Sequence, residues 1–181
     1  MYKDNNIVMQ LHVGAIRNNN TKVFSKLGGD CGVDCIGDPL SITNVNKLLD
    51  DMLSDDALPK TIIYPINPVD YTALSTTCIN FNCELSSNYV SFGNAWWFND
   101  TIRGIRNQLT EIMESGQLPY FIGMLTDSRS FTSFSRHDFF RRILCNLIGE
   151  YVENGEFPFD EDILGEMLKD ICYRNAEKYF G

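Results

Sequence analysis

The sequence predicts an α/β fold built around parallel β-strands. Short segments rich in β-branched and aromatic residues alternate with longer segments whose apolar residues repeat at helical spacing. The alternation runs through four rounds of strand and helix, and the chain contains no low-complexity segment. With 181 residues, the chain can bury roughly 70% of its unfolded surface as one compact unit. We therefore expect a single domain over residues 1–181.

Four segments are predicted as strands because they are short and are either apolar throughout or alternate between apolar and polar residues. They cover residues 7–13, 60–66, 89–95 and 120–125.

Five segments are predicted as helices because their apolar residues recur at positions i, i+3, i+4 and i+7. Ser41 or Thr43 can cap the first helix, whereas the second is a weaker prediction because it is rich in Thr and Ser. The third and fourth helices end at Gly116 and Gly155, and glycine is common just beyond a helix. The five helices cover about residues 43–53, 69–79, 100–116, 135–155 and 161–179.

Two architectures fit this order of elements. An open, doubly wound sheet binds its ligand where the strand order reverses, whereas a (β/α)8 barrel carries its chemistry at the carboxyl ends of its strands. Four strand–helix units make half of such a barrel, and the first predicted strand begins a few residues after Met1. The sequence therefore also suggests a fragment of a larger fold.

Composition argues against several classes of partner. Fifteen Lys and Arg against 24 Asp and Glu give a net charge of −9, so we expect no binding to nucleic acid. No apolar run approaches the ~20 residues of a membrane span, and the start of the chain lacks the features of a signal peptide. We expect a soluble, cytoplasmic protein with no membrane partner.

Six cysteines are present, without a CxxC pair or a matching histidine spacing, which argues against a zinc knuckle. Cys145 and Cys172 fall within predicted helices, where a free thiol behaves as a small apolar residue. We expect buried, reduced thiols and no disulfide framework.

Candidate catalytic residues lie at or just past the C-terminal ends of the first and fourth predicted strands. His12 is either a core histidine or, at the mouth of a parallel sheet, a group that shuttles protons near neutral pH. Asp127 is either a loop carboxylate paired with Arg129 or a partly desolvated general base. Arg129 presents a planar fork that suits a substrate carboxylate or an enediolate.

Candidate substrate contacts lie nearby. Arg17 and Arg136 can add positive charge to an anion site, which an acidic protein needs for a negative substrate. Of Trp96 and Trp97, one can be packing while the other forms the floor of a sugar site.

The chain resembles uronate isomerase, also called glucuronate isomerase, of the amidohydrolase superfamily. Four blocks carry the resemblance: QLHVGAIRNNN at 10–20, AWWFND at 95–100, GMLTDSRSFTSFSRHDFFRRILCNLIGEYVENGE at 123–156 and DICYRNAEKYF at 170–180. It extends over essentially the whole chain and corresponds to the C-terminal portion of that enzyme. The resemblance implies the C-terminal half of a (β/α)8 TIM barrel, with four βα units, strands five to eight and a C-terminal helix.

The resemblance also implies the interconversion of D-glucuronate with D-fructuronate, and of D-galacturonate with D-tagaturonate. Under it, Asp127 is the base or a metal-linked carboxylate, His12 the proton relay and Arg129 the anion contact. The His-x-His pair of the superfamily is absent. A divalent metal such as zinc would therefore have an incomplete site, with Asp127 and His12 as ligands where three or four are needed.

The resemblance implies further that the N-terminal half of the enzyme, or self-association, covers the open barrel. The alternatives are an inactive, truncated remnant and a sugar-acid binding module.

Overall fold

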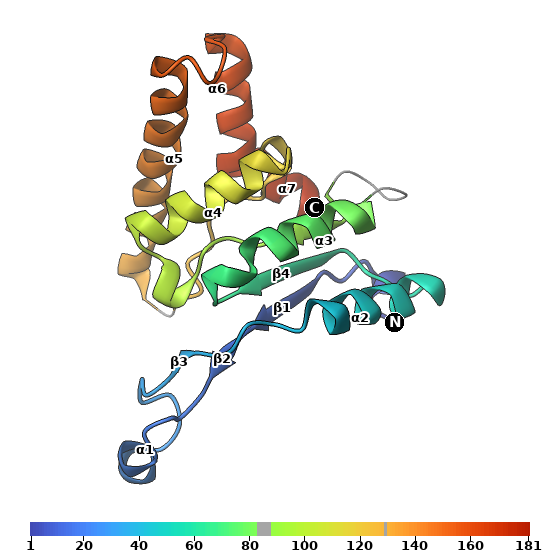
Figure 1. The fold of residues 1–181 in the computed structure, drawn as a ribbon, viewed down its shortest axis with the longest axis vertical. Helices are drawn as coiled ribbons and strands as arrows, with labels where there is room; N and C mark the ends of the chain where they lie inside the picture. Colours follow the sequence, from blue (N-terminus) through green and yellow to red (C-terminus); the bar gives the residue numbers. More distant parts are fainter. Residues whose placement is uncertain (83–87, 129) are drawn as a thin grey trace.

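A computed structural model describes residues 1–82, 88–128 and 130–181, and its centre is a parallel sheet of three strands in the order β1–β4–β5 (Figure 1). The strands are β1 Met9–Val13, β4 Thr61–Pro65 and β5 Val90–Phe92. The register places His12 opposite Tyr64, so both side chains lie on one face of the sheet. Three of the four predicted strands and their parallel arrangement are therefore confirmed.

The predicted helices are also present. The first three are α2 Ile42–Ser54, α3 Tyr71–Asn82, which follows the 3₁₀ turn η2 Pro68–Asp70, and α4 Ile102–Glu114. The last two are α5 Ser135–Glu153 and a continuous helical stretch made of α6 Glu161–Lys169, the π-helical η6 Asp170–Arg174 and α7 Asn175–Phe180. Further short 3₁₀ turns are η1 Lys3–Asn5, η3 Trp97–Asn99, η4 Leu118–Tyr120 and η5 Phe131–Phe134.

Helices α2, α3, α4 and α5 each contact the next; the first three lie along one side of the sheet, and α5 packs on α4 (Figure 1). The larger apolar core lies between this face and the helices and includes Leu49, Leu74, Val90, Leu109 and Leu144. A smaller cluster occupies the other face of the sheet: Ile62, Tyr64, Ile66, Trp96, Ile122 and Tyr179. The smaller cluster therefore includes residues next to the predicted site.

The prediction of a fourth strand at residues 120–125, all of which the structure describes, is wrong. Tyr120 ends the 3₁₀ turn η4, and residues 121–128 have no strand assignment. Gly123 has φ +78°, which interrupts an extended conformation, and a Cβ there would meet the carbonyl of Ile171. The Leu125 carbonyl accepts a hydrogen bond from the Asn94 side chain, 3.2 Å away, instead of from a strand.

The sequence did not predict the arm formed by residues 14–37. It contains the antiparallel pair β2 Ala15–Ile16 and β3 Cys35–Ile36, with helix α1 Thr21–Leu27 between them, and it extends away from the sheet (Figure 1). No apolar residue of the arm is buried, so the arm lacks the apolar periodicity on which the prediction of elements depends.

Two absences bear on the sequence predictions. Among the described residues, no helix is long and apolar enough to cross a membrane. Every cysteine that the structure describes is a free thiol: Cys31, Cys35, Cys78, Cys145 and Cys172; Cys83 lies outside the described residues. The prediction that the thiols are buried holds for Cys78 and is wrong for Cys35 and Cys145, which are exposed, because Cys35 lies on the arm and Cys145 on the solvent side of its helix.

Candidate active site

The carboxyl ends of β1 and β4 place a histidine between aromatic rings. The imidazole of His12 stacks on Tyr64, with ring centroids 4.6 Å apart, and meets the edge of Trp96 at 4.7 Å. The strand register explains the first contact, because residues opposite each other in parallel strands point to the same face. The His12 ring is therefore held in a fixed orientation while its side chain remains 35% exposed.

Asp127 approaches His12 from the segment that follows η4. Its Oδ2 lies 3.8 Å from Nε2 of His12, which is within ion-pair distance but too long for a hydrogen bond. The Asp127 side chain is 58% exposed, and its backbone has φ +41°, which is uncommon for a residue other than glycine. A carboxylate and an imidazole thus face each other at a solvent-accessible position.

Tyr64 packs against the His12 ring of this pair. Burial of its phenol, with a further effect of the Asp127 carboxylate, raises the Tyr64 pKa well above its ordinary value, so the phenol stays protonated. Its hydroxyl donates a hydrogen bond to Oε1 of Gln10 at 2.9 Å. Tyr64 therefore contributes a neutral ring and no negative charge to the site.

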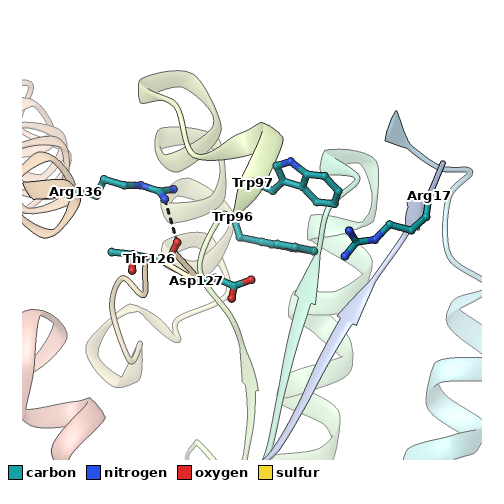
Figure 2. Close-up of a pocket in the computed structure, with 6 residues that line it drawn as sticks. All are labelled: Arg17, Trp96, Trp97, Thr126, Asp127 and Arg136. Atoms are coloured by element: carbon teal, nitrogen blue, oxygen red, sulfur yellow. Dashed lines mark hydrogen bonds between the residues drawn. The ribbon is translucent and has the colours of Figure 1, made fainter. Parts of the chain in front are cut away.

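A cavity of about 200 Å³ opens beside the Asp127 carboxylate, and Figure 2 shows the residues that line it. They are Arg17, Trp96, Trp97, Thr126, Asp127 and Arg136. An adjoining cavity of about 540 Å³ shares Arg17, Trp97 and Asp127 and reaches Asp30, Asp34 and Ser128. The combined space has indole faces, a carboxylate and guanidinium groups on its walls.

Arg17 enters the cavity from the arm. Its guanidinium carbon lies 4.9 Å from the ring centroid of Trp97, and Nη1 lies 3.3 Å from Asp34 and 3.8 Å from Asp30. The Asp34 side chain is only 5% exposed, and its other oxygen accepts a hydrogen bond from the backbone N–H of Asn18 at 2.7 Å. Arg17 is thus fixed against an indole by a buried carboxylate.

Arg136, in the first turn of α5, lies across the cavity from Arg17 (Figure 2). Its Nη1 donates a hydrogen bond to the carbonyl of Thr126 at 3.0 Å, and it forms an ion pair with Asp100. Both arginines that line the cavity therefore have acidic partners within the chain.

The structure brings together six of the seven residues predicted for the site; Arg129 lies outside the described residues. His12 and Asp127 form the pair, and Arg17, Trp96, Trp97 and Arg136 line the adjoining cavity. Sequence reasoning did not find Tyr64, Asp34 or Asp100. Only the strand register could have indicated Tyr64, while the two aspartates carry no local sequence signal that separates them from surface carboxylates.

The described residues do not fit a complete metal site. No group of three or more His, Cys, Asp or Glu side chains in this part of the chain is placed to hold an ion. His12 and Asp127 offer two donors, whereas a stable zinc site needs three or four. A carboxylate and an imidazole can each exchange a proton with a bound molecule near neutral pH.

Comparison with known proteins gives a consistent result over the whole chain. The family model described as glucuronate isomerase matches residues 1–180. Uronate isomerase from Clostridium perfringens is 47% identical over 180 residues, which are 99% of this chain and 39% of the relative. Uronate isomerase from Histophilus somni is 51% identical over 179 residues, which are 99% of this chain and 38% of the relative. The chain thus spans less than half the length of these relatives.

Solved structures agree with the sequence relatives. The crystal structure of uronate isomerase from Thermotoga maritima has a TM-score of 0.87 and 33% identity, covering 98% of this chain and 38% of that one. Glucuronate isomerase from Caulobacter crescentus has a TM-score of 0.84 at 24% identity, over 98% of this chain and 36% of that one, which supports the fold alone. The match of the family model over residues 1–180 establishes that the chain belongs to the glucuronate isomerase family.

Proposed function

We propose that this chain supplies part of the active site of an aldose–ketose isomerase. Its reaction is the interconversion of D-glucuronate with D-fructuronate, and of D-galacturonate with D-tagaturonate, through an enediol. The observation that carries the proposal is the approach of the Asp127 carboxylate to 3.8 Å from the His12 imidazole at the wall of a cavity. A carboxylate and an imidazole are the usual groups for moving protons near neutral pH.

The proposed roles follow from the chemistry of the two groups. In the direction from aldose to ketose, Asp127 removes the proton from C2, and protonated His12 donates a proton to the C1 oxygen, which gives the enediol. His12 then accepts the proton of the C2 hydroxyl, and Asp127 returns its proton to C1. Both groups end in their starting protonation states, so the cycle is balanced.

The cavity walls suit the rest of a sugar acid. Both tryptophans line the cavity, Trp96 from the smaller apolar cluster and Trp97 from a less buried position, and Arg17 carries its charge over the Trp97 ring. We propose Arg17 and Arg136 as contacts of the substrate, with Arg129 as the anion contact.

We also propose that residues 1–181 form one domain, the C-terminal half of a (β/α)8 barrel. The parallel order β1–β4–β5, with helices on one face, supports this. The barrel would then be closed by the part of the family's enzymes that this chain does not match, or by self-association. If the complete enzyme holds a divalent metal such as zinc, Asp127 and His12 contribute at most two of its ligands. The cytoplasmic location remains a prediction.

Complementation tests the proposal. D-glucuronate is incubated with this chain alone, with the portion of the Clostridium perfringens relative that the chain does not match, and with both, and ketose formation is followed. We expect activity only in the mixture. Absence of activity, when both parts are folded and associated, would contradict the proposal.

Asp127→Asn gives the sharper result within the mixture. We expect it to lower kcat roughly 10²–10⁴-fold, since it removes a general base and leaves the shape of the site. The control is Asp51→Asn, because Asp51 lies on α2 with a side chain 60% exposed, close to the exposure of Asp127. Equal activity of both variants would remove Asp127 from the mechanism.

A sugar-acid binding module is the second candidate, and the lining of the cavity favours it. Both tryptophans of the chain line this cavity, so intrinsic fluorescence reports on it directly. Saturable quenching by D-glucuronate, retained in Asp127→Asn and accompanied by an inactive mixture, would support binding without catalysis.

A further inference from the structure

The segment that carries Asp127 is held by side chains. Residues 121–128 have no strand assignment, although Asn94, just beyond β5, donates a hydrogen bond to the Leu125 carbonyl at 3.2 Å. Arg136 donates to the next carbonyl, that of Thr126, at 3.0 Å. Asp127 follows immediately with φ +41°, a conformation that persists only where the surroundings hold it. The place of the Asp127 carboxylate therefore depends on the groups that fix residues 125 and 126.

Arg136 is in turn held by Asp100. The Asp100 side chain is 3% exposed and pairs with the guanidinium of Arg136. Among the described residues, Arg136 is the cation paired with Asp100, so the charge of Arg136 offsets the burial of the carboxylate. Removing the charge of Asp100 frees Arg136 from its anchor.

Asp100 is also tied to the tryptophan side of the cavity. It directly follows η3, and its N–H donates a hydrogen bond to the carbonyl of Trp97 at 3.2 Å. The Asp100–Arg136 pair thus connects the turn that carries Trp97 with the segment that carries Asp127. These two segments form neighbouring walls of the cavity in Figure 2.

We propose that Asp100 is a positioning residue. Through Arg136 it fixes the Thr126 carbonyl and thereby holds the Asp127 carboxylate 3.8 Å from His12. The proposal rests on the proposed function only for the catalytic role of Asp127; the mechanical link is a property of the chain itself.

Hydrogen exchange in the chain without substrate tests the mechanical link. Asp100→Asn keeps the size of the side chain and removes its charge. We expect amides of residues 122–128 to exchange about tenfold faster or more, with those of β4 and α4 unchanged, because only the local opening becomes easier. Asp100→Glu, which keeps the charge, should restore part of the protection.

Asp138→Asn is the matched control. Asp138 lies on the same helix as Arg136 and pairs with Arg141 and Arg142 at the surface, so its loss should leave residues 122–128 protected. Unchanged exchange of residues 122–128 in Asp100→Asn would overturn the proposal. So would exchange that rises equally along the whole chain, because Asp100 would then be a general stabilising residue.

Kinetics of the complemented enzyme give an independent readout. A displacement of about 1 Å at a catalytic group can cost a factor of about 100, so we expect Asp100→Asn to lower kcat about 10–100-fold with KM nearly unchanged. A raised KM at constant kcat would overturn the proposal, since Asp100 would then act on substrate affinity. If the unsubstituted mixture is inactive, the proposed function fails while the exchange experiment still decides the role of Asp100.

Discussion

Replacing Gly93 by alanine should push the His12 ring out of place from the far side of Tyr64. Gly93 follows β5 and is not among the glycines with positive φ, so its backbone accepts alanine. A Cβ at this position would lie 2.8 Å from Cγ of Tyr64 and closer still to Cδ1 and Cε1. Tyr64 is fully buried and has His12 stacked 4.6 Å away on its ring. The ring can therefore yield only by disturbing His12 or the smaller core cluster.

The expected loss of stability follows from adding a methyl group where there is no free space. Extra methyl groups in well-packed cores cost about 1–3 kcal/mol, because side chains leave their preferred rotamers and the backbone shifts. We expect Gly93→Ala to lower the free energy of unfolding by that amount. Displacement of His12 should also lower kcat in the complemented enzyme.

Urea unfolding of the chain, followed by circular dichroism, measures the stability change. Gly149→Ala serves as the control, because Gly149 lies within α5 and an added Cβ meets nothing within 4 Å. It should raise the free energy of unfolding by about 0.5–1 kcal/mol, the usual gain when alanine replaces a helical glycine. The double variant Gly93→Ala/Tyr64→Leu should lose less than the two single variants together, by a coupling of about 0.5–3 kcal/mol. A neutral Gly93→Ala, or strict additivity, would refute the reasoning.

Two further predictions concern ionisable groups far from the cavity. Hydrogen bonds from Arg174 and Lys169 lower the pKa of Glu166 from 4.5 to about 2, so the stability it contributes is complete above pH 4.5 and is lost as the pH falls toward 2. Glu166→Gln should flatten the pH dependence of unfolding in that window, and an unchanged slope would contradict the pairing. Burial raises the pKa of the Cys78 thiol to about 12, so iodoacetamide near pH 8 should label exposed Cys145 and spare Cys78 in the native chain, as mass spectrometry of the peptides would show. Equal labelling of the two would refute this.

The sequence predicted the helices and three strands because each presents a regular apolar pattern to the core. Leu49 in α2 and Leu144 in α5 belong to such patterns, and both are fully buried. The fourth strand failed for a tertiary reason, since Gly123 turns the backbone against Ile171, which is distant in sequence. The arm was not predicted because its apolar residues are not buried, and their spacing therefore follows no regular pattern.

The candidate site was predictable where it depends on strand ends. His12 lies near the carboxyl end of β1 and Trp96 lies beyond that of β5, and the carboxyl ends of parallel strands lie at one edge of the sheet. The partners of these residues were not predictable, because they depend on register and on contacts across the fold. Tyr64 meets His12 through the pairing of β1 with β4, and Asp100 meets Arg136 only once α5 is packed.

An aspartate paired with an arginine lies next to backbone with positive φ at two places around the cavity, on opposite sides. Of the six described residues other than glycine with positive φ, Trp97 and Asp127 line this cavity, Asn18 directly follows the lining residue Arg17, and Asp30 lines the adjoining cavity. Asp34 pairs with Arg17 and also accepts a hydrogen bond from the backbone N–H of Asn18. Asp100 pairs with Arg136 and donates its own N–H to the carbonyl of Trp97. Arg136 in turn donates to the carbonyl of Thr126, directly before Asp127. Strained backbone persists only where its surroundings determine it, and a mostly buried carboxylate with its arginine does so here. Both arginines are therefore held in one orientation by the chain itself, which is what the proposed function requires of a site that binds a sugar acid without first rearranging.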